Sequence, residues 1–365
     1  MLCISTVTYV PMWFKKLQEF PDLPMQILEN FSLQPYNTFH IDAKARYFSK
    51  FSNVEELSQL TTNDSRLRTF ILGGGSNILF TEDFDGLVLK NEVKGIDVIG
   101  EDNDHVYVKA GAGENWHQFV LQCLDNNWSG IENLSLIPGN VGASPMQNIG
   151  AYGVEIREVF HELKAFHLRE KSNYVFGLKD CEFGYRDSVF KNKYRDQFVI
   201  LHVTLRLNKI PKFNTSYGAV EQELEKMGVK ELSIRAISQA VTNIRSSKLP
   251  DPAVIGNAGS FFKNPVIRQE QYNQLKTKFP DMIGYENNDE VKIAAAWLIE
   301  HTGPQPNKSW KGFRTGDAGC HEKQALVLVN YGNAKGQEIF DLSERIMLSV
   351  KQKFDIQLER EVNII

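Results

Sequence analysis

Apolar side chains recur three or four residues apart in three stretches of the chain, 114–124, 233–245 and 334–354. This spacing places them along one face of a helix, so each stretch is predicted to be an amphipathic helix packed on a core. The second stretch starts at Ser233, a residue type that commonly caps helix N-termini. The apolar positions that define the three faces are Trp116, Phe119, Val120, Cys123 and Leu124; Ile234, Ile237, Val241 and Ile244; and Ile339, Leu342, Ile346 and Val350.

Other segments have the patterns of strands and of one further helix. Residues 52–60 begin with Ser52, and Glu55 follows three positions later, a capping-box pattern that predicts a helix. Alternating or continuous apolar residues predict strands over 105–109, Phe198–Leu207, Gln324–Asn330 and Ile356–Ile364. Helices and strands are mixed along the chain, which indicates an α+β protein with several sheets.

Composition and charge limit the class of protein further. The chain has 365 residues, enough for two or three domains, and is 42% hydrophobic and 24% charged, as ordinary globular proteins are. Its net charge of −4 argues against a nucleic-acid partner. No run of about 18 or more apolar residues occurs, so no membrane-spanning helix is predicted.

The cysteines and the N-terminal segment favour a cytoplasmic protein. Residues 1–25 show no periodic pattern, and the basic pair Lys15–Lys16 follows the apolar stretch instead of preceding it, which argues against a signal peptide. Met12 or Met25 could be the true start. The four cysteines are widely spaced and form no CxxC pair, so we predict reduced thiols and neither a disulfide nor a zinc site. They are Cys3, Cys123, Cys181 and Cys320.

Two glycine-rich segments are candidates for binding an anion. Residues 71–77 read ILGGGSN, which fits neither a Walker A loop nor GxGxxG, since Ile78 stands where the third glycine should be. The segment could be a tight turn between strands, or its amides could cradle an anion. Pro138–Gly153 lies in a stretch without any charged residue, and offers glycines, Ser144, Gln147 and Asn148. A long loop of this kind favours a pyrophosphate site, with amide side chains facing a ring system.

Candidate catalytic groups lie in two other segments. Arg186, between Tyr185 and Asp187, could form a surface ion pair or bind a carboxylate or enolate. Ser260 follows Gly259 and precedes two phenylalanines, so it is either a buried hydrogen-bonded serine or a proton donor. Its surroundings do not form a nucleophile elbow.

Three further features each have a structural and a functional interpretation. Arg245 and Lys248 could cap a helix C-terminus or bind phosphate. Glu359 and Glu361 share one face at strand spacing, either as exposed charges or as a carboxylate at an enzyme site. The eight histidines show no HxxxH or HExxH pattern, so no metal site is predicted.

Together these segments resemble the UDP-N-acetylenolpyruvoylglucosamine reductase family. The resemblance covers nearly the whole chain past about residue 30, with the elements in the family's order. The matching segments are NTFHIDAKA (37–45), LGGGSNILF (72–80), GAGENWHQ (111–118), IPGNVGASPMQNIGAYGVE (137–155), CEFGYRDSVFK (181–191), KLPDP (248–252), GNAGSFFKNP (256–265), QALVLVN (324–330) and LEREV (358–362).

The resemblance implies a three-part α+β flavoenzyme. Two parts would form an FAD-binding fold of the vanillyl-alcohol-oxidase/PCMH type, and a C-terminal α+β domain would close over the substrate. The boundaries we expect are an N-terminal extension over 1–25, a first FAD-binding subdomain over 26–95 completed by 355–365, a second over 96–249, and a substrate-binding domain over 250–354.

The resemblance also implies the reaction and its catalytic residues. NADPH would reduce FAD and leave, after which the reduced flavin would pass a hydride to C3 of UDP-N-acetylglucosamine enolpyruvate in peptidoglycan precursor synthesis. Ser260 would protonate C2, while Arg186 and Glu361, not Glu359, would bind the substrate carboxylate and stabilise the enol-like intermediate. A fixed guanidinium aimed at the developing charge lowers the barrier, and the hydride chemistry belongs to the flavin.

Binding residues follow from the same resemblance. Tyr217 resembles the tyrosine that clamps the UDP moiety in one of the two subtypes, and Lys248 would meet the diphosphate, with Tyr152, Asn264 and Gln324 as further substrate contacts. We expect a monomer with no nucleic-acid or membrane partner. The cofactor contacts expected are Gly73, Gly74, Gly75, Ser76, Asn77, Pro138, Gly139, Gly142, Ala143, Ser144, Gln147, Asn148 and Gly150.

The chain departs from the family pattern at three places, and two other functions stay open. Residues 302–316 are longer and more basic than expected, Asn363 replaces a basic residue, and residues 1–25 have no counterpart. None of these changes removes a catalytic position. An oxidase of small alcohols with the same FAD fold, or a sensor that binds the sugar nucleotide without turnover, would also fit the motifs.

Overall fold

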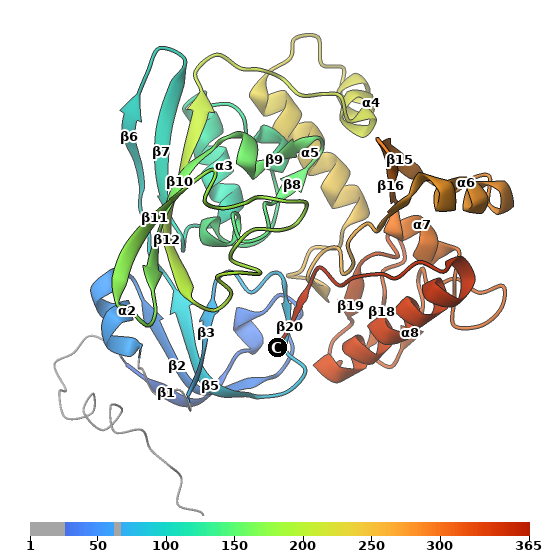
Figure 1. Ribbon diagram of the computed structural model, residues 1–365, viewed down its shortest axis with the longest axis horizontal. Helices are drawn as coiled ribbons and strands as arrows, with labels where there is room; N and C mark the ends of the chain where they lie inside the picture. The colour runs from blue at the N-terminus through green and yellow to red at the C-terminus, as the bar shows by residue number, and fades with distance from the viewer. Residues whose placement is uncertain (1–25, 62–66) are drawn as a thin grey trace, which may run out of the picture.

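The computed structural model describes residues 26–61 and 67–365, and it has three groups of sheets (Figure 1). The expectations for residues 1–25, including Cys3 and the start codon, lie outside the described residues. Among the residues that the structure describes, no helix is long and apolar enough to cross a bilayer.

The first sheet has the strand order β1-β2-β5-β3 and carries the first glycine-rich loop. β1 (Leu28–Ser32) is antiparallel to β2 (Lys44–Phe51), whereas β5 (Phe84–Asn91) runs parallel to both β2 and β3 (Arg68–Leu72). Helix α2 (Val54–Leu60) follows β2. β5 is nearly all buried, as expected for a central parallel strand covered on both faces.

The second sheet is antiparallel, with the order β11-β10-β12-β7-β6. Helix α3 (Trp116–Asp125) buries its five predicted apolar residues in the core of this part. Helices α4 (Gly218–Lys226) and α5 (Ile234–Lys248) pack on each other through their own apolar cluster. The strands of the sheet are β6 (Ile96–Glu101), β7 (His105–Gly111), β10 (Phe160–His167), β11 (Ser172–Gly177) and β12 (Phe198–Asn208).

The third part combines two small antiparallel sheets with helices. One sheet has the order β13-β19-β18-β17 and the other β14-β16-β15. Its helices are α6 (Gln269–Lys278), α7 (Ala295–Glu300) and α8 (Gly336–Phe354). The strands are β13 (Gly256–Asn257), β14 (Val266–Arg268), β15 (Gly284–Asn287), β16 (Glu290–Ile293), β17 (Arg314–Thr315), β18 (Ala318–Cys320) and β19 (Leu328–Asn330).

The chain then returns from the third part to the first. β20 (Asn363–Ile364) pairs in parallel with β4 (Ile78–Leu79), just after the glycine-rich loop, and Figure 1 shows this end of the chain between the two parts. One apolar core spans both parts and includes Phe39, Phe261 and Ile339. The remaining short elements are the strands β8 (Gly150–Ala151) and β9 (Val154–Glu155) and the 3₁₀ turns η1 (Gln34–Tyr36), η2 (Glu132–Leu134), η3 (Val141–Ala143) and η4 (Ile156–Glu158).

The strongly periodic predictions are confirmed. The helices over 114–124, 233–245 and 334–354 correspond to α3, α5 and α8, and Ser233 caps α5 through the amide of Ala236. The strands predicted over 105–109 and Phe198–Leu207 correspond to β7 and β12. Each element is long enough for its buried face to determine its structure.

Three predictions need correction. The N-cap of α2 is Asn53, not Ser52, because the Asn53 side chain accepts the amide of Glu56 at 2.9 Å. The strand predicted over Gln324–Asn330 is limited to β19, since Val327 donates back to the Gln324 carbonyl in a turn. The final strand over Ile356–Ile364 has ladder pairing only at β20, although its burial alternates.

The prediction of reduced thiols is confirmed for the described cysteines. Cys123, Cys181 and Cys320 are free and buried. Burial raises the pKa of the Cys181 thiol and of the Cys320 thiol to about 12. These side chains therefore act as small apolar core residues and not as nucleophiles.

Helix α8 offers a test of the core shared by the third and first parts. Ile346 is fully buried and Leu348 is 58% exposed on the same helix. We expect Ile346→Ala to lower the free energy of unfolding by about 2–5 kcal/mol, because it leaves a cavity. Leu348→Ala should change it by less than about 0.5 kcal/mol. Denaturant titration measures both, and equal losses would contradict this view of the core.

Candidate active site

A cavity of about 710 Å³ lies where the two glycine-rich loops meet. This volume is typical of small-molecule sites, which span roughly 300–1,000 Å³. Residues from all three parts line it, including Trp116, Arg186, Ser260 and Glu361. The expected cofactor residues that line it are Gly73, Gly74, Gly75, Ser76, Asn77, Pro138, Gly142, Ala143, Ser144, Gln147 and Gly150.

Close backbone contact explains two of the three glycines in the first loop. A Cβ on Gly74 would lie 2.6 Å from Cα of Gly139, so the two loops touch at this point. Gly75 has φ +65°, and a Cβ there would lie 2.0 Å from the Tyr36 carbonyl oxygen. The Ser76 hydroxyl donates to the Pro138 carbonyl at 3.1 Å. The tight-turn interpretation therefore holds for Gly74 and Gly75.

Gly73 is different, because a Cβ built there meets no protein atom within 4 Å. Gly73 lines the cavity. Packing within the protein therefore does not require a glycine here, whereas a group bound in the cavity would leave no room for a larger side chain. Among the residues that the structure describes, none accepts a hydrogen bond from the amides of Gly74, Gly75 or Ser76. Such a loop can cradle an anion such as the diphosphate of a dinucleotide.

Two expected cofactor residues do not line the cavity. Gly139 supports the contact with Gly74, and its carbonyl accepts the Trp116 amide. Asn148 is fully buried, and its side-chain amide donates to Glu155 and to the Gly184 carbonyl. Its oxygen accepts the amide of Arg157 at 3.2 Å. Of the two amides expected to face a ring system, only that of Gln147 reaches the cavity.

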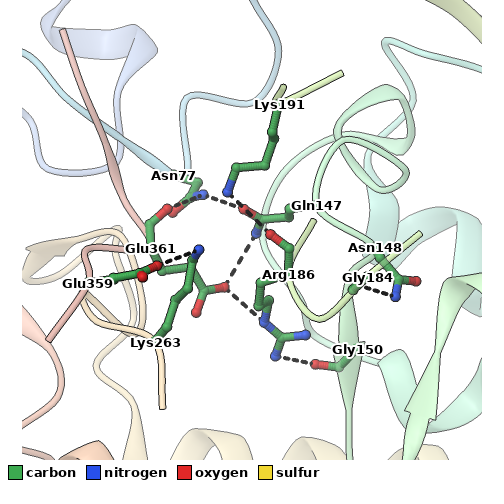
Figure 2. A network of polar contacts seen from close by, with 10 residues as sticks. All are labelled: Asn77, Gln147, Asn148, Gly150, Gly184, Arg186, Lys191, Lys263, Glu359 and Glu361. Carbon is green, nitrogen blue, oxygen red and sulfur yellow. Dashed lines mark hydrogen bonds and ion pairs between the residues drawn. The ribbon is translucent and has the colours of Figure 1, made fainter. Parts of the chain in front are cut away.

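Arg186 and Glu361 meet in this cavity. Nε of Arg186 lies 3.1 Å from Oε1 of Glu361, and Nη2 donates to the Gly150 carbonyl at 2.7 Å. Figure 2 shows the two side chains pointing toward each other, with Glu361 coming from the C-terminal segment after α8. Arg186 has φ 53°, a strained backbone conformation that occurs often at functional sites. The plain surface ion pair with Asp187 is excluded, since both Asp187 oxygens accept from Asn192.

Ser260 opens onto the same cavity. It is half-buried, and among the described residues its hydroxyl has no hydrogen-bond partner. The next carbonyl, that of Phe261, accepts the amide of Glu361 at 2.9 Å, which joins the serine segment to the glutamate segment. Gly259, with φ +69°, makes the turn that presents Ser260. The alternative of a serine engaged in buried hydrogen bonds does not hold.

Burial raises the pKa of Glu361 above its usual value, although Arg186, Lys191 and Lys263 act in the opposite direction. Only 14% of its side chain is exposed. The side chain of Asn77 donates both to Gln147 Oε1 at 2.9 Å and to the Glu361 carbonyl at 3.2 Å (Figure 2). Glu361 is thus held from the first, second and third parts at once.

Glu359 has a different environment from Glu361. Its side chain is 71% exposed and pairs with Lys263 at 3.1 Å. Lys263 and Glu359 also bond through their backbones, in the antiparallel contact that joins the segment after Ser260 to the segment before Glu361. The two glutamates therefore do not share one face, and only Glu361 lines the cavity.

Lys191, which was not predicted as a site residue, and Arg245, predicted only as an alternative phosphate binder, also line the cavity, as do Arg68 and Arg195. Lys191 donates to the Arg186 carbonyl at 3.3 Å, and burial lowers its pKa. It is the last residue of the CEFGYRDSVFK segment, which was the available signal. Arg245 donates from Nε to the Leu136 carbonyl at 3.2 Å, and burial lowers its pKa as well. Of the pair Arg245 and Lys248, only Arg245 lines the cavity.

The expected substrate contacts lie outside the cavity lining. The rings of Tyr152 and Tyr217 meet edge to face with their centroids 5.4 Å apart, and Tyr152 lies beside Arg245. Lys248 is exposed at the end of α5. Oδ1 of Asn264 accepts the Ala295 amide, and Oε1 of Gln324 accepts that of Leu326. Within the described parts of the chain, no group of three or more His, Cys, Asp or Glu side chains is placed to hold a metal ion.

Comparisons with known proteins identify the class of enzyme. Residues 47–167 match the family described as FAD binding domain, and residues 251–365 match UDP-N-acetylenolpyruvoylglucosamine reductase, C-terminal domain. The glycine-rich cradle and its uncommitted amides fit such a cofactor, so this is an FAD-dependent oxidoreductase.

Relatives along the full length give the family. The enzymes named UDP-N-acetylenolpyruvoylglucosamine reductase from Flavobacterium johnsoniae and Amoebophilus asiaticus are each 50% identical, over 93% of this chain and 100% of theirs. The chain belongs to the UDP-N-acetylenolpyruvoylglucosamine reductase family, which confirms the resemblance seen in its motifs. The crystal structure of the Thermus caldophilus reductase has the same fold, with TM-score 0.64 and 22% identity over 93% of this chain and 98% of that one.

Gly73→Ala should separate cofactor binding from folding. Its methyl group would enter the cavity without touching protein, so we expect unchanged stability of the apoprotein. FAD binding should weaken by roughly 1–3 kcal/mol, typical of overpacking. Fluorescence titration with FAD measures the affinity. Gly100→Ala, equally unobstructed but on β6, is the control and should bind FAD normally. Normal FAD affinity in Gly73→Ala would contradict the position of the cradle.

Glu361→Gln should change how stability of the apoprotein depends on pH. Because the pKa of Glu361 is raised on folding, its contribution is fully present below the ordinary value of 4.5 and is lost as pH rises through the folded pKa. The wild type should therefore lose stability relative to Glu361→Gln over that window. Unfolding titrations at several pH values measure the difference. A constant difference, or the same pH dependence in the exposed control Glu359→Gln, would contradict burial as the cause.

Proposed function

We propose that this chain uses FAD and NADPH to reduce UDP-N-acetylglucosamine enolpyruvate to UDP-N-acetylmuramate, a step of peptidoglycan precursor synthesis. One observation carries the assignment of residues: Arg186, Ser260 and Glu361, from three distant segments, line a single cavity together with both glycine-rich loops. A guanidinium, a hydroxyl and a carboxyl with a raised pKa are what the reduction of an enolpyruvyl ether requires of a protein.

The cofactor would lie along the two loops. The amides of Gly74, Gly75 and Ser76 would face its diphosphate, and Gln147 and Arg245 would border its ring system. When bound, FAD supplies the hydride chemistry that no side chain can perform. The protein supplies orientation, charge stabilisation and the proton.

Arg186 is placed to bind the carboxylate of the substrate. Its Nε is committed to Glu361 and its Nη2 to Gly150, and among the described residues Nη1 has no hydrogen-bond partner. Two contacts fix the plane of the guanidinium, so its remaining N–H groups meet the substrate at little entropic cost. Hydride addition at C3 moves negative charge toward the carboxylate oxygens, and this fixed cation stabilises that charge.

Ser260 and Glu361 handle the proton. The Ser260 hydroxyl, which has no partner among the described residues, donates to C2 once the enolate has formed. Glu361 orients Arg186, and burial raises its pKa, which favours the protonated form of this carboxyl beside the bound substrate. Tyr217, Tyr152, Lys248, Asn264 and Gln324 would contact the sugar nucleotide around this centre.

The wider context of the protein forms part of this proposal. The three groups of sheets serve as two FAD-binding subdomains, 26–95 with 355–365 and 96–249, and a substrate-binding domain, 250–354. The enzyme acts in the cytoplasm as a monomer, without nucleic acid. The described cysteines, all free and buried, support a reducing compartment.

The visible spectrum of the purified protein tests the proposed function. A flavin-loaded sample should bleach on addition of NADPH and, under anaerobic conditions, regain its colour only when the enolpyruvyl sugar nucleotide is added. Bleaching by a small alcohol in place of NADPH, followed by rapid recovery with oxygen, would instead indicate an oxidase. Binding of the sugar nucleotide with no recovery would indicate a sensor.

Ser260→Ala should slow only one of the two half-reactions, the reduction of the substrate. Bleaching by NADPH needs no proton from Ser260 and should stay close to the wild-type rate. Recovery with substrate should slow by roughly 10²–10⁴-fold, the usual contribution of general acid catalysis. Stopped-flow absorbance measures both halves. Ser246→Ala, an exposed serine on α5, is the control and should be normal in both. Equal slowing of the two halves in Ser260→Ala would refute the assigned role.

A further inference from the structure

Lys90 is a partly buried cation that the proposed mechanism does not use. It lies on β5, next to β3 in the first sheet (Figure 1), and its Nζ donates to the Gly73 carbonyl oxygen at 2.9 Å. Gly73 and Gly74 line the cavity, whereas Lys90 does not. The ammonium group therefore contacts the first glycine-rich loop from β5 without lining the cavity itself.

This contact determines the direction of the next amide. No described peptide bond is cis, so the carbonyl oxygen of Gly73 and the N–H of Gly74 point in opposite directions across one planar unit. Because Lys90 holds the oxygen on the β5 side, the N–H of Gly74 is turned toward the cavity side. Among the described residues this N–H has no acceptor. A cation on the oxygen also polarises the peptide and strengthens the N–H as a donor.

Lys90 has no carboxylate partner of its own among the residues that the structure describes. The nearby acid Glu92 pairs with Lys50 at 3.0 Å, and Glu114 pairs with Lys94 at 3.5 Å. Burial lowers the pKa of Lys90, so the site is unfavourable for its charge. A partly buried, unpaired cation destabilises the free protein, and an anion bound across the loop would offset that destabilisation.

We infer that Lys90 is a positioning residue for the cofactor: it fixes the Gly73–Gly74 peptide so that the Gly74 amide meets the FAD diphosphate, and adds positive potential behind the loop. This inference rests on the proposed placement of FAD along the two glycine-rich loops. Its effect is specific to ligands that carry the diphosphate. Riboflavin, which has the same ring system and no phosphate, should not depend on Lys90.

Direct binding to the apoprotein tests this inference. Equilibrium titrations with FAD and with riboflavin compare the wild type with Lys90→Met. We expect FAD affinity to fall by about tenfold, a factor equivalent to about 1.4 kcal/mol, with riboflavin affinity changed by less than about twofold. Lys90→Gln, which keeps a shorter neutral hydrogen-bond donor, should lose FAD affinity by no more than Lys90→Met does.

A nearby lysine provides the matched control. Lys94 also donates to a glycine carbonyl, that of Gly113, but this glycine does not line the cavity. Lys94→Met should therefore bind both ligands as the wild type does. Unchanged FAD affinity in the Lys90 variants, or equal loss for FAD and riboflavin, overturns the inference. Failure of the wild type to bind FAD would instead contradict the proposed cofactor site, so the two failures are distinguishable.

Discussion

The structure depends on one ion pair, between Arg186 of the second part and Glu361 near the end of the chain. The two side chains come together because residues 359–361 run beside residues 261–263, and because β20 then pairs with β4. These contacts also place Ser260 beside the pair. The ion pair is partly buried, so the cost of desolvating both groups opposes their Coulombic attraction. Its main effect is to hold the two side chains in one orientation. Loss of that geometry would leave the cavity without an oriented cation.

Electrostatics in the cavity combine dipoles with a few buried charges. The net charge of the chain is −4, yet five arginine and lysine side chains line the cavity against three carboxylates, those of Glu82, Asp196 and Glu361. Burial lowers the pKa of Lys191 and of Arg245 and raises that of Glu361. Each shift opposes the charged form, so the site is arranged to gain stability when an anionic ligand enters.

Much of this arrangement could be predicted from the sequence, where local chemistry decides the structure. The apolar faces of α3, α5 and α8 follow from spacing alone, and the tight turn found at Gly74 and Gly75 was one of the two interpretations of the first glycine-rich loop. The strand predicted over Ile356–Ile364 is confirmed only at β20, because its pairing depends on a partner segment far away in the sequence. Asn148 was misjudged and Lys191 was missed for the same reason: whether a polar side chain faces a cavity or another loop is a tertiary property.

The pairing of β20 with β4 has a consequence for how the molecule acquires its site. It joins residues 78–79 to residues 363–364, and closing so long a loop costs conformational entropy before the contacts form that offset it. Contacts of this range form late, after helices and local sheets. During refolding, the molecule would therefore pass through species with native-like secondary structure in which Glu361 has not yet reached Arg186. Such species would hold most of the fold and none of the assembled catalytic centre.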